Sequence, residues 1–211
     1  MATIAVIDYG MGNLRSVAKA LELVGCGRVE MSADPDRLRR AARLVFPGQG
    51  AIRDCMSELQ RLELIDALAE FVQTKPFLGI CIGLQALMRR SDESGGVEAL
   101  GLFAGEARHL GSAVAPQHAL KIPHVGWNRV RQTRAHPLWH GIPDGSRFYF
   151  VHSYYVTPED PALTAGTTDY GITFTSALGR GNVFATQFHP EKSQRVGLDL
   201  LANFAGWDGA V

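Results

Sequence analysis

The sequence lacks the features that would mark a nucleic-acid-binding, membrane or secreted protein. Its 21 Lys and Arg residues match 21 Asp and Glu residues, so the formal net charge is zero. A zero balance gives no electrostatic reason to expect a nucleic acid or an anionic membrane surface as a partner. No stretch approaches the roughly 20 apolar residues that a membrane helix needs. Residues 1–8 have no basic n-region, and their apolar run is too short for a signal peptide.

Cysteine is also scarce, since the sequence contains only Cys26, Cys55 and Cys81. An odd number argues against a disulfide framework and favours a reducing compartment, for which we expect the cytoplasm. The remaining composition is that of a globular protein, with 46% apolar and 20% charged residues among 211. This length is enough for one domain with a buried core, so we assign residues 1–211 to a single domain.

The N-terminal part of the sequence alternates between short strand-like runs and helical patterns. The helix that follows the fourth run is expected to extend through Met88. Alternation of this kind predicts an α/β fold with a mostly parallel central sheet and helices on both faces. The four predicted strands are residues 3–8, 28–31, 43–46 and 77–80.

The pattern changes after residue 96, where helical periodicity gives way to short β-rich pieces. These pieces predict a small antiparallel or mixed β extension of the sheet. Ser193 is a candidate cap for a last helix whose apolar positions include Leu200 and Phe204. The β-rich pieces are residues 146–151, 154–156, 163–166, 172–177 and 183–186.

Cys81 lies between Gly79 and Gly83, after a short apolar run and before a helix-forming stretch. This order is typical of a nucleophile at a sharp strand-to-helix turn, as in G-x-S-x-G with Cys in place of Ser. A helix N-terminus favours a thiolate, because its free N–H groups and dipole attract an anion. In that geometry the N–H of Ile82 would point at a developing oxyanion. A buried structural cysteine is an equally good interpretation of this segment alone.

A cysteine nucleophile needs a base, and the sequence offers His189 and Glu191. Because they are two residues apart, an extended segment would project both side chains to one side. The carboxylate could then orient the imidazole, whose other nitrogen would take the thiol proton. The alternative is a surface histidine beside a solvated glutamate.

The segment Pro47-Gly48-Gln49-Gly50 follows the third predicted strand. Its two glycines would allow a peptide to present its N–H to the site, as a second oxyanion donor worth about 10²–10³ in rate. A plain strand-to-helix turn is the alternative, and a P-loop is excluded because no Gly-Lys-Ser/Thr follows.

Together these three motifs resemble the class I, triad-type glutamine amidotransferases, and the resemblance spans nearly the whole chain. It implies a flavodoxin-like sheet and no metal ion or cofactor. The segments Asp8-Tyr9-Gly10-Met11-Gly12-Asn13 and 121–128 are similar to the glutaminase subunits of imidazole glycerol phosphate synthases, of histidine biosynthesis. Residues 149–154 agree with that similarity.

The resemblance implies that Cys81 attacks the carboxamide of glutamine, that His189 transfers the proton, and that Glu191 orients His189. Ammonia and a γ-glutamyl thioester result, and water hydrolyses the thioester. The N–H groups of Ile82 and of one residue among Gly48, Gln49 and Gly50 would hold the oxyanion. The middle residue of that loop is commonly Val in these subunits, and we assign no role to the Gln49 side chain. The residues implied to hold the substrate are Gln85, His152, Ser153 and Tyr154.

The resemblance also implies a partner, a cyclase subunit with a (β/α)₈ barrel that forms a heterodimer with this chain. A flip of the 48–50 loop would be a plausible switch that keeps the glutaminase slow until the partner arrives. A glutaminase for another synthase, a stand-alone γ-glutamyl hydrolase and a non-catalytic binding module are the alternatives. The candidates for the partner interface or the ammonia path are Lys121, His124, Trp127, Asn128 and Tyr149.

Overall fold

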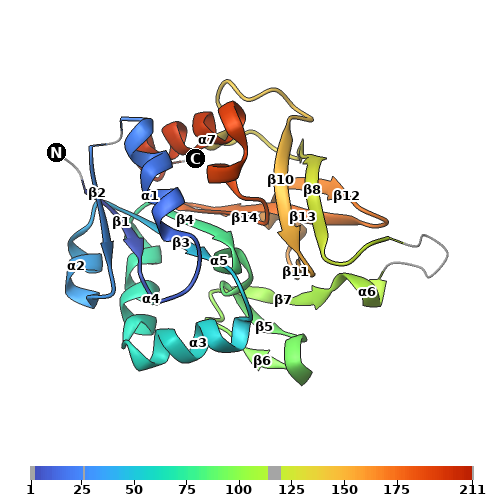
Figure 1. Cartoon of the computed structure of the whole chain (residues 1–211), viewed down its shortest axis with the longest axis horizontal. Helices are drawn as coiled ribbons and strands as arrows, with labels where there is room; N and C mark the ends of the chain where they lie inside the picture. The colour runs from blue at the N-terminus through green and yellow to red at the C-terminus, as the bar shows by residue number, and fades with distance from the viewer. Residues whose placement is uncertain (1–2, 26, 114–119, 211) are drawn as a thin grey trace.

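The computed structural model describes residues 3–25, 27–113 and 120–210, so Cys26 lies outside the described residues. Its large sheet has the strand order β2-β1-β3-β4-β14-β13-β11-β7-β5-β6 (Figure 1). The strands from β2 to β14 pair in parallel, as the sequence predicts for the first four of them. Residues 183–186 were expected in the antiparallel or mixed extension, but β14 pairs in parallel with β4 and antiparallel with β13, so it is the junction between the two parts of the sheet. They are β1 (Thr3–Ile7), β2 (Arg28–Ser32), β3 (Arg43–Gly48), β4 (Phe77–Cys81) and β14 (Val183–Thr186).

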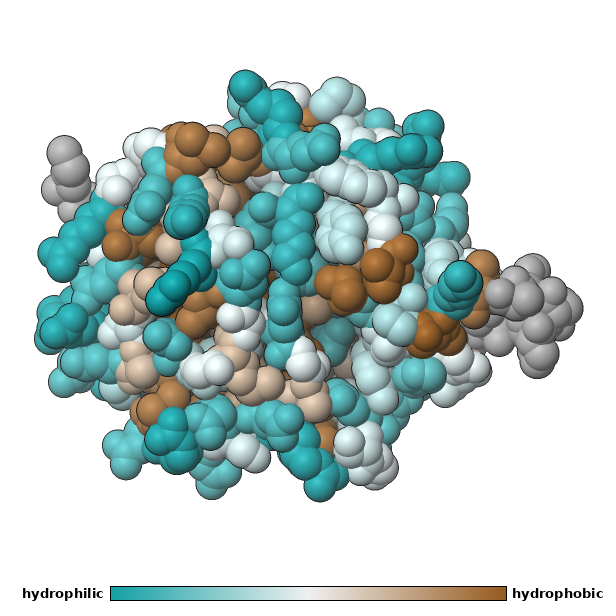
Figure 2. Space-filling model, viewed as in Figure 1, coloured by the Kyte–Doolittle hydropathy of each residue, from teal (hydrophilic) through white to brown (hydrophobic). Residues whose placement is uncertain are grey.

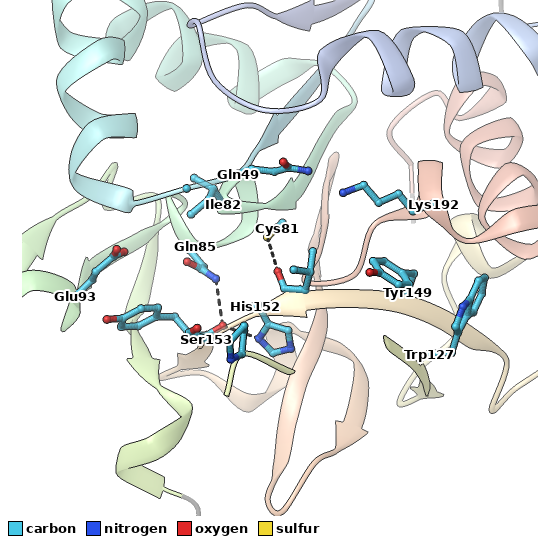
Figure 3. Close-up of a pocket in the computed structure, with 14 residues that line it drawn as sticks. Gln49, Cys81, Ile82, Gln85, Glu93, Trp127, Tyr149, His152, Ser153 and Lys192 are labelled. Carbon is cyan, nitrogen blue, oxygen red and sulfur yellow. Dashed lines mark hydrogen bonds between the residues drawn. The ribbon is translucent and has the colours of Figure 1, made fainter. Parts of the chain in front are cut away.

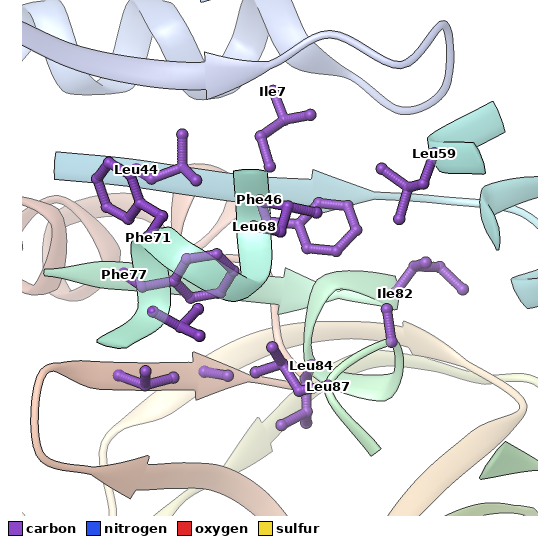
Figure 4. Close-up of a cluster of buried hydrophobic side chains, with 14 of the residues drawn as sticks. Ile7, Leu44, Phe46, Leu59, Leu68, Phe71, Phe77, Ile82, Leu84 and Leu87 are labelled. Carbon is purple, nitrogen blue, oxygen red and sulfur yellow. The ribbon is translucent and has the colours of Figure 1, made fainter. Parts of the chain in front are cut away.

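Helices cover both faces of the parallel strands, which confirms the predicted α/β architecture (Figure 1). Successive side chains of β1 enter two different buried clusters, because a strand points alternate residues to opposite faces. Ile4 and Val6 belong to the cluster under α1 and α7, whereas Ala5 and Ile7 belong to the cluster under α2, α3 and α4 (Figure 4). The helices are α1 (Leu14–Leu23), α2 (Pro35–Arg40), α3 (Ile52–Arg61), α4 (Leu64–Thr74) and α7 (Gln194–Gly206).

The remaining strands form the predicted antiparallel and mixed extension. β13 pairs antiparallel with β14 and β11, and β11 pairs antiparallel with β7. A separate antiparallel pair, β8 and β10, lies beside this extension (Figure 1). These strands are β5 (Met88–Ser91), β6 (Val97–Glu98), β7 (Phe103–His109), β8 (His124–Arg129), β9 (Arg131–Gln132), β10 (Arg147–His152), β11 (Tyr154–Pro158), β12 (Thr164–Asp169) and β13 (Thr173–Arg180). Short connecting helices are Glu93–Gly95, Leu110–Ala113, Pro137–Trp139 and Pro161–Leu163.

The helix predicted through Met88 is wrong in its extent. The helix after β4, α5 (Ile82–Gln85), has a single turn, and Met88 already begins β5. The carbonyls of Ala86 and Met88 accept hydrogen bonds from the N–H groups of residues 100 and 101. Because these carbonyls pair with a distant segment, they cannot accept the bonds that would continue the helix.

The face of the molecule in Figure 2 is mostly hydrophilic, and its apolar side chains lie in separate patches. Within the described residues, every helix is too short or too polar to cross a bilayer.

Candidate active site

Three parallel strands end side by side where the candidate nucleophile lies. Gly48 at the end of β3 is opposite Cys81 at the end of β4. On the other side of β4, Thr186 of β14 is opposite Ile80, so the chain beyond β14 begins next to Cys81. The carboxyl ends of the strands in an open α/β sheet are where such folds place their ligands.

Cys81 forms the sharp strand-to-helix turn that the sequence predicts. Its backbone has φ 56° and ψ −104°, a conformation rarely adopted by residues other than glycine. A Cβ on Gly83 would lie 1.9 Å from the Phe46 carbonyl oxygen, and one on Gly79 would lie 2.8 Å from the Gly83 carbonyl oxygen. The two glycines therefore let the turn pack against β3 and against itself. The Cys81 side chain is buried but lines the pocket described below.

His189 and Glu191 form a buried hydrogen-bonded pair. His189 Nδ1 lies 2.8 Å from Glu191 Oε1, and each side chain is only 2% exposed. The sequence predicted the pairing but not its geometry, because Pro190–Lys192 is a 3₁₀ turn (η5) and not an extended segment. The His189 N–H donates to the Tyr149 carbonyl, and the Ser193 hydroxyl donates to the His189 carbonyl. Backbone anchors on both sides therefore fix the position of the imidazole.

The other imidazole nitrogen of His189 is free to act on the thiol. Nε2 is buried and has no hydrogen-bond partner among the described residues, yet it is close enough to Cys81 for the two groups to interact electrostatically. Burial lowers the pKa of His189, but the interactions with Cys81 and Glu191 outweigh it and raise that pKa to about 9. A raised pKa makes this imidazole a stronger base toward the thiol proton.

Ser193 does not act as the helix cap that the sequence predicts. It precedes α7, but its side chain makes no capping hydrogen bond. Its fully buried hydroxyl instead accepts the Tyr149 N–H at 2.9 Å and donates to the His189 carbonyl at 2.6 Å. Ser193 thus ties the histidine segment to β10, a role that sequence reasoning missed.

A pocket of about 720 Å³ opens over Cys81 (Figure 3). The four predicted substrate-holding residues all line it, and Gln85 Nε2 donates to the Tyr154 carbonyl at 3.2 Å. The charged residues Glu93 and Lys192 also line it, although the sequence analysis assigned them no role. Lys192 directly follows Glu191, so its position in the motif was an available signal. The lining residues are Gln49, Gly50, Cys81, Ile82, Gln85, Glu93, Pro123, Trp127, Tyr149, Val151, His152, Ser153, Tyr154 and Lys192.

The candidate oxyanion residues lie at the same pocket. Gln49, Gly50 and Ile82 line it, and Gly48 lies beside Cys81 in the sheet register. A side chain at position 48 would collide with the Tyr9 hydroxyl, since a Cβ there would lie 2.2 Å from that oxygen. The direction of the loop N–H groups toward a substrate stays a prediction. Among the described residues, no group of three His, Cys, Asp or Glu side chains could hold a metal ion.

The candidate interface residues lie on or next to β8 and β10. Trp127 is 42% exposed and packs edge-on against Tyr149, which is opposite it in the register. Lys121 is exposed, and Asn128 is half-buried. His124 is buried between the rings of Phe150 and Tyr170, so it lies behind the surface rather than on it. Contact of these residues with a partner stays a prediction.

Comparison with known proteins agrees with this geometry. The chain is 57% identical over 211 residues to "Imidazole glycerol phosphate synthase subunit HisH 1" of Pseudomonas aeruginosa, covering 99% of each chain. It is 56% identical over 210 residues to the HisH subunit of Nitrosococcus oceani, again covering 99% of each. The solved structure of PurLQS from Thermotoga maritima contains a chain with the same fold, with a TM-score of 0.68 at 18% identity over 96% of this chain and 95% of that one. The sequence model of the class-I glutamine amidotransferases matches residues 5–206, and the chain belongs to that family.

Proposed function

We propose that this chain is the glutaminase subunit of imidazole glycerol phosphate synthase. The observation that carries the proposal is the Cys81 turn, which lines a pocket large enough for an amino acid and lies within interaction distance of the buried His189–Glu191 pair. The choice of synthase is supported by relatives of that name with 56% and 57% identity over nearly their full length.

The first half of the reaction forms a thioester. The Cys81 thiol passes its proton to His189 Nε2, and the sulfur electron pair forms a bond to the carboxamide carbon of glutamine. The carbonyl π electrons move to the oxygen, where the N–H groups of Ile82 and of the 48–50 loop stabilise the negative charge. When the tetrahedral intermediate collapses, the C–N bond breaks, and the nitrogen takes the proton from His189 and departs as ammonia.

The second half returns the enzyme to its starting state. His189 takes a proton from water, and the resulting oxygen nucleophile attacks the γ-glutamyl thioester. The C–S bond breaks, the sulfur regains its proton from His189, and glutamate is released. Throughout, Gln85 and residues 152–154 hold the amino-acid end of the substrate, and Glu191 keeps the imidazole in the tautomer that presents Nε2 to the sulfur.

The ammonia must reach an acceptor directly, because free ammonia is mostly protonated at neutral pH and then has no lone pair for attack. We assign the acceptor site to a cyclase subunit with a (β/α)₈ barrel, which forms a cytoplasmic heterodimer with this chain. That subunit makes imidazole glycerol phosphate and AICAR from phosphoribulosyl-formimino-AICAR phosphate. The β8–β10 surface around Trp127 borders the pocket, so it is the surface on which we place the partner.

Replacing Cys81 with alanine tests the nucleophile. We expect Cys81→Ala to lose glutamine-dependent activity while its complex with the cyclase still uses added ammonium salts. Mass spectrometry of the quenched wild-type complex should detect a γ-glutamyl adduct on the peptide that contains Cys81. Glutamine hydrolysis by Cys81→Ala at a wild-type rate would overturn the assignment.

The partner can be tested with two exposed apolar residues. Trp127→Ala should weaken binding of the cyclase by at least tenfold, since a buried interface tryptophan is typically worth about 2 kcal/mol or more. Leu23→Ala is the matched control, because Leu23 is 73% exposed at the end of α1 and does not line the pocket. Full glutaminase activity without the cyclase, or equal binding of both variants, would favour a stand-alone hydrolase or a different synthase.

A further inference from the structure

The side chain of Gln187 reaches the sulfur that the proposed reaction uses. Thr186 of β14 lies opposite Ile80 of β4, so the next residues, Gln187 and Cys81, emerge together at the carboxyl edge of the sheet. Gln187 is fully buried, and its backbone N–H donates to the Ser176 carbonyl at 2.9 Å. Its Nε2 lies 3.6 Å from Cys81 Sγ, within hydrogen-bonding distance for sulfur.

A backbone carbonyl determines which end of this carboxamide faces the sulfur. The Tyr154 carbonyl can only accept a hydrogen bond, so the Gln85 atom 3.2 Å from it is the amide nitrogen. That nitrogen also lies 3.2 Å from the Gln187 side chain, whose nearest atom must therefore be the acceptor Oε1. The NH₂ group of Gln187 is left facing Cys81 Sγ. Exchanging oxygen and nitrogen in either amide would place two donors or two acceptors against each other.

We propose that Gln187 is a catalytic residue that stabilises the negative charge on Cys81 Sγ through its Nε2–H group. This inference rests on the proposed glutaminase function. When the thiol proton moves to His189, the electron pair stays on the sulfur, and the Gln187 donor compensates that charge until the S–C bond forms. The same donor stabilises the sulfur again when it leaves the thioester. A hydrogen bond to an ionised group in a buried site is stronger than one in water.

A second contact of the sulfur, with a backbone carbonyl, has the opposite preference. The Val151 carbonyl oxygen lies 4.0 Å from Sγ and can only accept, so it favours the protonated thiol (Figure 3). Gln187 can only donate toward the sulfur, so it favours the thiolate. Because Gln187 Oε1 is held by Gln85, a residue of the glutamine pocket, the donor is already oriented before the substrate is attacked.

The variant Gln187→Met tests the proposal, since methionine has a similar length but neither donates nor accepts strongly. In the complex with the cyclase, we expect kcat for glutamine hydrolysis to fall about 10- to 100-fold, as for loss of a hydrogen bond to a charged group. The rate of Cys81 alkylation by iodoacetamide at fixed pH should fall by a similar factor. Gln60→Met, at an exposed position of α3, is the matched control and should match the wild type in both assays.

The variant Gln187→Glu separates the donor from the acceptor and serves if the methionine variant does not fold. It keeps an oxygen for Gln85, but its ionised form offers no hydrogen to the sulfur, whereas its protonated form does. Its activity relative to the wild type should therefore decline as pH rises, with KM for glutamine changing less than kcat. Alkylation of Cys81 at the wild-type rate in both variants would overturn the proposal, even if kcat fell, because Gln187 would then act only by positioning Gln85.

The two proposals fail in different ways. Glutamine hydrolysis by Cys81→Ala would refute the proposed function and, with it, this inference. An inactive Cys81→Ala together with wild-type kcat and alkylation in Gln187→Met would refute the role of Gln187 alone.

Discussion

Replacing Glu191 with glutamine removes the charge that orients the proposed base while keeping the shape of the side chain. Glu191 Oε1 accepts from His189 Nδ1 at 2.8 Å, and both side chains are almost fully buried. Glutamine can present either its oxygen or its NH₂ group to Nδ1, so the imidazole can adopt the tautomer whose Nε2 cannot accept the thiol proton. Loss of the orienting carboxylate in a comparable triad costs about 10⁴ in kcat. We therefore expect Glu191→Gln to lower kcat by about 10²- to 10⁴-fold.

The same substitution should change how stability depends on pH. Although burial lowers the pKa of His189, its interactions with Cys81 and Glu191 raise it to about 9 from an ordinary 6.5. That difference corresponds to roughly 3 kcal/mol of folding free energy. Because the folded-state pKa is the higher one, this stabilisation is complete below pH 6.5 and is lost as pH rises through about 9. Glu191 supplies only the smaller part of it, because the interactions with Cys81 are the larger of the causes that raise this pKa.

The contribution of the Glu191 carboxylate to the free energy of unfolding can be measured by urea unfolding. The wild type and Glu191→Gln are compared at a series of pH values from about 6 to about 10. The variant should be less stable than the wild type at the acid end, by less than the roughly 3 kcal/mol of the whole shift, and this difference in stability should narrow toward the alkaline end. A difference independent of pH would refute the electrostatic reasoning. A kcat within tenfold of the wild type would refute the orienting role of the carboxylate.

Three other predictions concern packing, thiol access and acid stability. Gly83→Ala should destabilise the fold by several kcal/mol and lower the melting temperature, because its Cβ would lie 1.9 Å from a carbonyl oxygen. Gly206→Ala in α7 is the control, because open space surrounds that position, and its melting temperature should equal or exceed that of the wild type. Iodoacetamide should modify Cys81 in the native protein but not Cys55, because Cys55 is fully buried and burial raises its pKa to about 12. Peptide mapping locates the modified cysteine, and modification of Cys55 in place of Cys81 would contradict this prediction. Burial and the Arg134 charge lower the pKa of His136 to about 4, so stability should fall as pH drops from about 6.5 toward 4, and His136→Phe should reduce that loss in acid unfolding curves.

The sequence was sufficient to predict the parallel strands because their burial on both faces leaves continuous apolar runs. The strands β1, β3 and β4 lie where those runs predict them. Residues 183–186 were predicted as a strand of the antiparallel extension, because a run of four residues does not show that its second neighbour is the parallel strand β4. The end of α5 was not predictable, because it depends on backbone hydrogen bonds from residues 100 and 101 to Ala86 and Met88. The local sequence contains no pattern that predicts these bonds. Local propensity favoured helix there, and tertiary pairing overrode it.

The site was predictable to the extent that its residues occur in compact motifs. His189 and Glu191 were paired correctly although the segment is a 3₁₀ turn, because both an extended chain and that turn bring the two side chains together. Gln187 belongs to the same motif, and its position directly after β14 was an available signal. Its role was missed because the direction of a buried amide depends on partners far away in sequence, here Gln85 and Tyr154.

A buried histidine pair shares the Tyr154 carbonyl with Gln85. The carbonyl accepts from Gln85 and, at 2.8 Å, from His152 Nδ1. His152 Nε2 must then be an acceptor, and it receives a hydrogen bond from His124 Nδ1 at 2.9 Å. Burial lowers the pKa of His152 to about 3 and that of His124 to about 4, so both rings stay neutral and keep these tautomers at physiological pH. The Tyr154 carbonyl alone therefore determines which way the Gln85 and Gln187 amides point, and hence that the Cys81 sulfur faces a donor, while the two neutral histidines satisfy the second acceptor position of that carbonyl.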